Sequence, residues 1–273
     1  MPELSSHPKI IAIANQKGGV GKTTTAINLA AALSERDSRV LLLDLDPQGN
    51  ASTGLGISPT DRTSTTYDFV IGDEDLSSIL QPTPVANTML APATTDLASA
   101  DLAIAKRENR TGLLRSAFMR NASTLARFDH ILIDCPPSLN LLTLNALVAA
   151  NSVLVPLQSE FFALEGLSQL LLTVREVREA SNPDLRIEGI LLTMYDRRNN
   201  LSQQVEKDAR DTMGKMVFET VIPRNVRISE APSFALPVLS YDTASRGAAA
   251  YRALAREVLR NQDAMVSAGG VAQ

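Results

Sequence analysis

A glycine-rich run at residues 15–24, NQKGGVGKTT, carries the residue types best suited to binding a polyphosphate. Glycines allow backbone N–H groups to converge on phosphate oxygens, and the N-terminus of a following helix adds positive potential. In this pattern Lys22 contacts the β- and γ-phosphates, and the Thr23 hydroxyl binds Mg²⁺. A plain glycine turn between a strand and a helix is the alternative interpretation. The complete Gly-Lys-Thr ending favours a P-loop, whose phosphate-binding residues would be Lys17, Gly18, Gly19, Val20, Gly21, Lys22, Thr23 and Thr24.

Three aspartates at the ends of two apolar segments are candidate partners of a phosphate-bound cation. Asp44 and Asp46 end the run RVLLLDLD, and strand alternation places both on the same side. Asp134 ends the run FDHILID, which has a Walker B pattern. Ligands gather at the carboxyl ends of parallel strands, and neighbouring carboxylates need a cation or a proton between them. We therefore predict that Asp44 and Asp134 join Thr23 at a Mg²⁺ site. An Asp-Pro turn that caps a helix is the alternative for Asp46.

Apolar segments that alternate with helical ones must position these residues. The sequence predicts buried strands at residues 9–14, 39–45, 128–134, 152–157, 187–194 and 216–221. It predicts helices at residues 23–34, 141–150, 162–180 and 244–260. Strands that are apolar throughout indicate a mostly parallel sheet with both faces covered. The predicted fold is an α/β P-loop nucleoside triphosphatase, with a twisted sheet flanked by helices on both faces.

Composition and organisation point to one globular domain over residues 1–273. The chain is 44% hydrophobic and 21% charged, which excludes a disordered protein. We expect a short N-terminal arm at residues 1–8, a polar surface excursion at 57–66 and a flexible tail at 264–273. No apolar run approaches the ~18 residues of a membrane-spanning helix. The absence of an apolar leader and the single cysteine, Cys135, predict a cytoplasmic location.

The charge of the chain is unevenly distributed. Its net charge is −4, and residues 1–105 carry 12 acidic and 6 basic side chains. Residues 197–260 instead carry 11 basic and 7 acidic side chains, and most basic residues of the chain are arginines. Such a distribution allows a locally basic face that binds DNA phosphates. A mixed, solvated helical surface is the plainer alternative.

The run KGGVGKTT is the deviant form of the Walker A motif. With it, the chain resembles the superfamily of dimeric P-loop ATPases that includes ParA, MinD and the nitrogenase iron protein. Further segments, spread over nearly the whole chain, resemble the ParA/Soj partitioning ATPases of chromosomes and plasmids. They are LDLDPQGNASTGLG (43–56), ILIDCPPSLNLLTLNAL (131–147), VPLQSEFFALEGLSQLL (155–171), LTMYD (192–196), VIPRNVRISEAPS (221–233) and SRGAAAY (245–251). One departure is Ala235-Leu236, where many relatives carry Gly-Lys or Gly-Gln.

The resemblance implies catalytic roles for three residues. Lys17 would reach across a dimer interface to the nucleotide of the other subunit, as an arginine finger does. Asp46 would polarise the attacking water, and Lys22 would hold the phosphates. Asp44 would support the hydration shell of Mg²⁺, and Asp134 would act on the ion through water.

The resemblance also assigns residues to the base and to DNA. It implies that Met194, Pro223 and Asn225 border the adenine. It places three arginines near the nucleotide or the DNA-binding face, with Arg224 assigned to the nucleotide and Arg198 and Arg227 to DNA.

The function implied by the resemblance is an ATP-dependent dimerising switch in DNA segregation. ATP and Mg²⁺ would join two copies into a homodimer that binds double-stranded DNA without sequence preference. A ParB-type partner would then stimulate slow hydrolysis and release the dimer, which would be nucleoid-associated only in its ATP-bound form. About eight residues precede the first predicted strand, so we expect the small, non-specific DNA-binding type rather than the larger type with a helix-turn-helix domain.

Three other functions compete with this interpretation. A MinD-like positioning ATPase would need a basic amphipathic C-terminal helix, whereas residues 264–273 contain no lysine, arginine or aromatic residue, so no membrane partner is expected. A nitrogenase-type electron carrier would need several cluster-binding cysteines. A metabolic P-loop ligase or kinase stays open, because the sequence says nothing about a small-substrate pocket.

Overall fold

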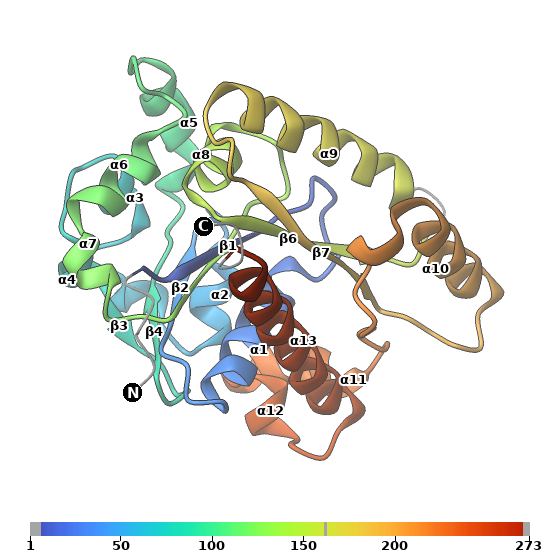
Figure 1. The fold of residues 1–273 in the computed structure, drawn as a ribbon. Coiled ribbons are helices and arrows are strands. Elements are labelled where there is room, and N and C mark those ends of the chain that lie inside the picture. The colour runs from blue at the N-terminus through green and yellow to red at the C-terminus, as the bar shows by residue number, and fades with distance from the viewer. Residues whose placement is uncertain (1–6, 161–162, 270–273) are drawn as a thin grey trace.

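The computed structural model describes residues 7–160 and 163–269, in which seven strands form a sheet between two layers of helices (Figure 1). The strand order is β3-β4-β2-β5-β1-β6-β7, and every neighbouring pair is parallel except β3 and β4. This arrangement confirms the predicted fold class. The strands are β1 (Lys9–Ile13), β2 (Val40–Asp44), β3 (Gln81–Pro82), β4 (Thr88–Ala91), β5 (His130–Asp134), β6 (Ser152–Gln158) and β7 (Arg186–Thr193).

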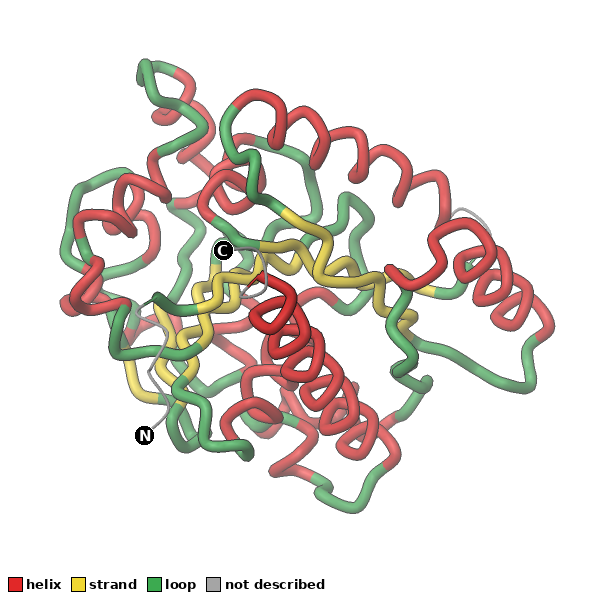
Figure 2. Tube along the Cα trace, in the orientation of Figure 1, coloured by secondary structure: helices red, strands yellow, loops and turns green. Residues whose placement is uncertain are grey.

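Helices cover both faces of the sheet (Figures 1 and 2). One layer contains α1, α11, α12 and α13, and the other contains α5, α6, α8, α9 and α10. The α-helices are α1 (Lys22–Ser34), α2 (Asn50–Gly54), α3 (Thr66–Val70), α4 (Leu76–Ile79), α5 (Leu97–Ala105), α6 (Leu113–Arg120), α7 (Ala122–Leu125), α8 (Leu141–Ala149), α9 (Ala163–Ala180), α10 (Asn200–Met213), α11 (Val226–Glu230), α12 (Val238–Tyr241) and α13 (Arg246–Gly269). Short 3₁₀ turns lie at Pro59–Asp61, Gly214–Met216 and Ala231–Phe234.

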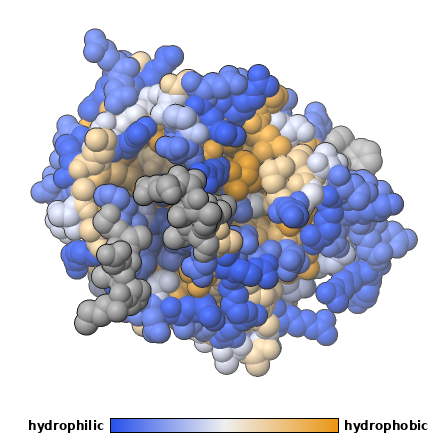
Figure 3. Space-filling view, viewed as in Figure 1, coloured by the Kyte–Doolittle hydropathy of each residue, from blue (hydrophilic) through white to orange (hydrophobic). Residues whose placement is uncertain are grey.

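Successive residues of each central strand enter two different hydrophobic cores. In β1, Ile11 and Ile13 pack with the layer of α1 and α13, whereas Ala12 and the following Ala14 pack with the opposite layer. Both faces of these strands are buried, which explains why their sequences are apolar without alternation. Figure 3 shows apolar residues gathered near the centre and right of the face in view, with hydrophilic residues around them.

Residues 216–221, which the sequence predicts as a strand, form no strand in the structure. Within these residues the structure has one isolated bridge to β7, between Val217 and Ile190. The N–H groups of Glu219 and Thr220 donate instead to the carboxylate of Glu257 on α13, at 2.7 and 3.0 Å. A side-chain acceptor therefore replaces the strand neighbour that the apolar pattern predicts.

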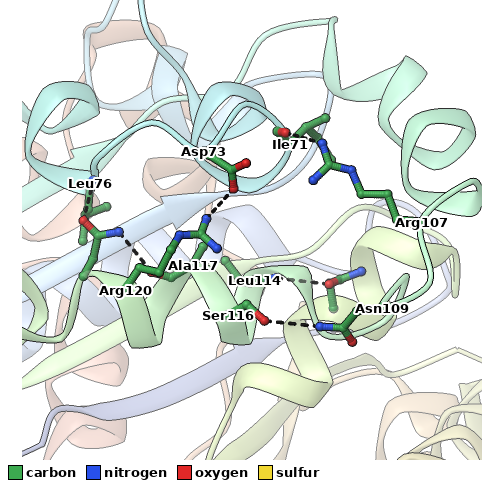
Figure 4. Close-up of polar contacts among 11 residues, drawn as sticks. Ile71, Asp73, Leu76, Arg107, Asn109, Leu114, Ser116, Ala117 and Arg120 are labelled. Carbon is green, nitrogen blue, oxygen red and sulfur yellow. Dashed lines mark hydrogen bonds and ion pairs between the residues drawn. The ribbon is translucent and has the colours of Figure 1, made fainter.

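The region between β2 and β5 contains elements that the apolar pattern does not predict. β4 adds a parallel strand beside β2, and helices α2 to α7 also lie between β2 and β5 in the chain. Residues 57–66, predicted as a surface excursion, are only partly exposed, because Arg62, Thr65 and Thr66 are buried. Polar contacts join the short helices. Asn121 Oδ1 accepts the N–H of Leu76 at 2.9 Å, and Arg120 at the end of α6 pairs with Asp73 at 2.8 Å (Figure 4).

The first part of the predicted tail at 264–273 is helical. Helix α13 continues to Gly269, so the predicted tail begins within a helix. The rest of that segment, residues 270–273, lies outside the described residues, as do residues 1–6 of the predicted arm and residues 161–162 at the start of the long predicted helix.

Candidate nucleotide-binding site

The predicted P-loop connects β1 to α1 and closes around one lysine. Gly19 and Gly21 have positive φ angles of 75° and 90°, a conformation that glycine adopts without strain. Lys22 Nζ donates a hydrogen bond to the carbonyl of Lys17 at 3.0 Å, which fixes the loop around the buried ammonium group. The Thr193 hydroxyl at the end of β7 donates to the carbonyl of Val20 at 2.8 Å. The loop is therefore held in shape by its own backbone and by a neighbouring strand.

The two lysines of the P-loop point in different directions. Lys22 is 6% exposed and faces the carboxylates of the site. The side chain of Lys17 is 41% exposed, and its ammonium group pairs with the Glu160 carboxylate after β6 at 2.7 Å. One lysine is thus an internal charge, and the other lies at the rim.

The three predicted carboxylates meet at the carboxyl ends of two adjacent strands. Asp44 on β2 lies directly beside Asp134 on β5 in the strand register. Both are completely buried, and Asp46 is nearly so. Asp44 Oδ2 accepts hydrogen bonds from the Ser52 N–H at 2.9 Å and from the Ser52 hydroxyl at 2.6 Å. The structure therefore brings together the residues that the sequence predicts for the metal site.

Burial shifts the proton affinity of these groups. Desolvation raises the pKa of Asp44 to about 6, although the hydrogen bonds from Ser52 oppose the shift. Desolvation and the charge of Asp44 raise the pKa of Asp134 well above its usual range. Burial lowers the pKa of the Lys22 ammonium, and the charge of Asp134 opposes that change. Three buried or nearly buried carboxyl groups therefore lie near the Lys22 ammonium group in this site.

The residues present fit a bound Mg²⁺. Within the described chain, neither oxygen of the buried Asp134 carboxylate has a hydrogen-bond partner. The Thr23 hydroxyl lies near enough to lower the pKa of Asp134, but the geometry between the two side chains is not that of a hydrogen bond. Among the described residues, no cluster of three or more His, Cys, Asp or Glu side chains is arranged to hold a metal ion without further ligands. Mg²⁺ suits such a site, because it commonly keeps water and phosphate ligands beside one or two carboxylates.

A cavity of about 270 Å³ opens beside the P-loop and contains the residues predicted to border the base. Gly21 and Thr24 line it on the phosphate side, and Met194, Pro223 and Asn225 line it as well. Arg224 is also a lining residue, and its N–H donates to the Tyr195 carbonyl at 3.0 Å. Sequence reasoning missed the other lining residues, which include Thr193, Ile228 and Tyr251.

The two arginines predicted to contact DNA have different surroundings. Arg198 lines a groove of about 870 Å³ together with Arg197, Arg224 and Arg246. Its side chain is 90% exposed and pairs with Asp196 at 3.2 Å. Arg227 does not line this groove; its guanidinium pairs with two carboxylates, Glu230 at 2.9 Å and Asp242 at 3.3 Å. Arg197 and Arg246 are groove residues that the sequence analysis did not single out.

Comparison with known proteins places the site in a family. The sequence model of a family described as "AAA domain" matches residues 8–187. The chromosome partitioning protein ParA of Myxococcus xanthus is 52% identical over 252 residues, which cover 92% of this chain and 88% of that protein. The sporulation initiation inhibitor protein Soj of Bacillus subtilis is 51% identical over 253 residues, or 93% of this chain and 99% of Soj. The chain belongs to the ParA/Soj family of partitioning ATPases.

Solved structures agree with the ParA/Soj assignment and with the nucleotide site. A Mycobacterium smegmatis protein described as cobyrinic acid a,c-diamide synthase, with ADP and magnesium bound, superposes with a TM-score of 0.81 at 39% identity. The match covers 94% of this chain and 96% of that chain. The cell division ATPase MinD of Pyrococcus furiosus superposes with a TM-score of 0.76 at 27% identity, over 92% of this chain and 98% of MinD. ATPase relatives together with a nucleotide-bound structural neighbour support nucleotide hydrolysis by the ParA/Soj-family chain. None of its described helices is both long and apolar enough to cross a membrane.

Proposed function

We propose that this ParA/Soj-family chain is a Mg²⁺-dependent ATPase that dimerises on ATP, binds double-stranded DNA without sequence preference, and dissociates when a ParB-type partner stimulates hydrolysis. The observation that carries the proposal is the placement of the two P-loop lysines, one buried among carboxylates and one at the rim. A monomer needs only Lys22 to bind phosphate. A second lysine at the surface suits contact with a second nucleotide site.

The buried residues divide the reaction between them. Lys22 binds the phosphates, and the carboxylates of Asp44 and Asp134 with the Thr23 hydroxyl hold Mg²⁺, which supplies positive charge to the phosphate oxygens when bound. Asp46 begins the turn after β2 and orients the attacking water. Its Oδ1 accepts the N–H of Gln48 at 3.0 Å, so one oxygen is committed to the backbone. Among the described residues we find no strong general base beside these groups, and we therefore expect slow hydrolysis.

Dimerisation follows from the weak attachment of Lys17 in the monomer. Exposed ion pairs such as Lys17–Glu160 contribute about 0–1 kcal/mol. A polyphosphate carries more charge than one carboxylate, so the phosphates of a partner's nucleotide can replace Glu160 as the counter-charge of Lys17. The free energy released favours the ATP-bound dimer, in which each Lys17 completes the other subunit's site.

DNA binding is supported by the arginine groove. Arg197, Arg198, Arg224 and Arg246 line one groove on a protein whose net charge is negative. Arg224 also lines the candidate nucleotide cavity, so the arginine groove and this cavity have a lining residue in common. Two such grooves on one dimer double the number of phosphates that the protein neutralises. ATP-dependent assembly then converts a weak DNA-binding surface into a strong one, which keeps the dimer on the nucleoid.

A combined test measures size and DNA binding. Light scattering after gel filtration, with ATP, with ADP and without nucleotide, should show a dimer only with ATP. Fluorescence anisotropy with two unrelated duplexes should show ATP-dependent binding of equal affinity, with a log–log salt slope of about −0.9 per neutralised phosphate. Arg198→Ala and Arg227→Ala should each reduce that slope by about one for every phosphate that a subunit no longer neutralises. Arg120→Ala, which removes an exposed partner of Asp73 in another part of the molecule, is the matched control.

Two results would count against the proposal. Equal DNA binding in all three nucleotide states would separate the arginine groove from the switch. Turnover that depends on a small organic substrate and ignores DNA and ParB-type protein would favour a metabolic enzyme, as the description of the Mycobacterium smegmatis structure suggests for that protein.

A further inference from the structure

Arg62, in the loop after α2, is a buried arginine whose hydrogen bonds go to neutral oxygens. Its side chain lies beneath the turn that follows β2, and the residue is 8% exposed. Nε and Nη2 donate to the carbonyl of Ile57 at 3.2 and 2.7 Å, and Nη2 also donates to the Thr53 hydroxyl at 2.7 Å. Nη1 donates to the carbonyl of Ala93 at 2.9 Å. One guanidinium thus joins α2, the loop after it and the segment after β4.

The backbone of the turn at Gly49 rests directly on this guanidinium. Gly49 has a φ of 59°, and its N–H donates to the carbonyl of Asp46 at 2.9 Å. A Cβ placed on Gly49 would collide with Nη1 of Arg62 and would lie 2.9 Å from the Ala93 carbonyl oxygen. The turn that begins at Asp46 therefore depends on close contact between the Gly49 backbone and the Arg62 side chain.

The same clamp extends to the metal-site carboxylate. The N–H of Ala93, whose carbonyl accepts from Arg62, donates to the Ser52 hydroxyl at 3.1 Å. That hydroxyl in turn donates to Asp44 Oδ2. Helix α2 is consequently fixed to the segment after β4 at two points, through Arg62 and through Ser52. Both ends of residues 44–52 are held by this network, with Asp46 between them.

We propose that Arg62 is a positioning residue for ATP hydrolysis, which holds the Asp46–Gly49 turn at the geometry needed for attack on the γ-phosphate. This inference rests on the proposed function of Asp46. The hydrogen bonds of Arg62 do not reach the P-loop, so its removal should affect the chemical step rather than nucleotide binding. A lysine at this position offers one point charge in place of a planar group that donates in three directions, and it should not substitute.

The test separates turnover from binding in purified full-length protein. We expect Arg62→Ala and Arg62→Lys to lower kcat about tenfold or more while the Kd of a fluorescent ATP analogue changes less than about twofold. Guanidinium ion, at concentrations far below those that unfold proteins, should restore part of the activity of Arg62→Ala by occupying the vacated site. Thr53→Val, which removes one acceptor at similar volume, should give a smaller reduction of kcat and serves where Arg62→Ala does not fold. Arg39→Ala, whose exposed guanidinium pairs with Asp129 before β5, should keep the wild-type kcat and show no response to guanidinium.

A second measurement does not depend on activity. Hydrogen exchange in nucleotide-free Arg62→Ala should accelerate in residues 46–53 and stay unchanged in α13. A double-mutant cycle with Gly49→Ala should be non-additive, because the collision with Nη1 is present only when Arg62 is. A folded Arg62→Ala protein with wild-type kcat overturns the inference, and so does a uniform rise of exchange over the whole chain. Asp46→Ala, assayed in parallel, separates the inference from its premise: normal hydrolysis by that variant refutes the role proposed for Asp46 in orienting the attacking water.

Discussion

Replacing Asp44 with asparagine should stabilise the nucleotide-free protein at neutral pH while weakening its response to Mg²⁺ and ATP. Asp44 is completely buried beside Asp134, and desolvation raises its pKa from a usual value of 3.8 to about 6. The folded protein therefore binds the Asp44 proton more tightly than the unfolded chain does. Between these two pKa values the free energy of unfolding falls as pH rises, because the folded state must release a proton that the unfolded chain has already released.

The size of this effect follows from the shift. Two pKa units correspond to about 3 kcal/mol of free energy of unfolding at pH values above 6. Asparagine is isosteric, and its Oδ1 can still accept the N–H and hydroxyl of Ser52. The substitution also removes a charge that raises the pKa of Asp134. We thus expect the stability advantage of Asp44→Asn over the wild type to grow by about 3 kcal/mol between pH 4 and pH 7.5.

Urea unfolding of both proteins in EDTA, at several pH values from 4 to 8, measures this difference. Asp129→Asn is a control of opposite sign, since Arg39 lowers the pKa of Asp129 and its stabilising effect disappears as pH falls. Adding Mg²⁺ and ATP should then stabilise the wild type more than Asp44→Asn. A stability difference that is independent of pH would refute the reasoning that burial places unfavourable charge in this site.

Substitutions of the other charged residues of the site should separate binding, hydrolysis and assembly. Lys22→Ala should abolish ATP binding in calorimetry, because the phosphates lose their buried counter-charge; wild-type affinity would refute the P-loop assignment. Asp46→Ala should bind ATP, hydrolyse it far more slowly and remain dimeric, and a monomer in ATP would show that Asp46 is needed for assembly. Lys17→Ala should bind ATP as a monomer but fail to dimerise, whereas normal dimers would exclude the cross-subunit role. In the Glu160→Gln variant the ATP-bound dimer should form at lower protein concentration than in the wild type, because Lys17 is released from its partner in the monomer. An unchanged midpoint of the monomer–dimer transition would contradict the proposed competition between Glu160 and the nucleotide for Lys17.

The site was more predictable than the region that supports it. The P-loop and the carboxylates stand at the junctions of apolar strands with turns, and the parallel sheet brings such junctions to one edge. Asp44 and Asp134 could therefore be placed together from the strand pattern, and the strand register confirms it. The residues quoted for the base also meet in one cavity, although only the family resemblance indicated them.

Residues that act through tertiary contacts gave no signal in the sequence. Arg62 lies in a polar stretch that is typical of a surface, and only the three-dimensional structure shows that α2 and the segment after β4 bury it. Glu257 is one of several charged residues on α13, yet its carboxylate takes the N–H groups that a strand at 216–221 would have used. In both cases a buried charged side chain satisfies backbone groups, and neither apolar periodicity nor a motif records such a pairing.

On the proposed function, the electrostatics of the site allow a few residues to control the switch. Asp44 and Asp134 are buried side by side, and the positive charges of Lys22 and Arg62 oppose them only in part, since burial still raises the pKa of both carboxyl groups. Because this balance is unfavourable, binding of a nucleotide with its cation should stabilise the folded state more than its direct contacts alone would. Asp44 accepts hydrogen bonds from the Asp46 N–H in the turn after β2 and from Ser52 in helix α2, so a change in the charge around Asp44 acts on the same backbone that carries Asp46. On the proposed function, binding and hydrolysis are coupled through this short segment. Lys17, held at the rim by one exposed ion pair, then transmits the nucleotide state to the second subunit.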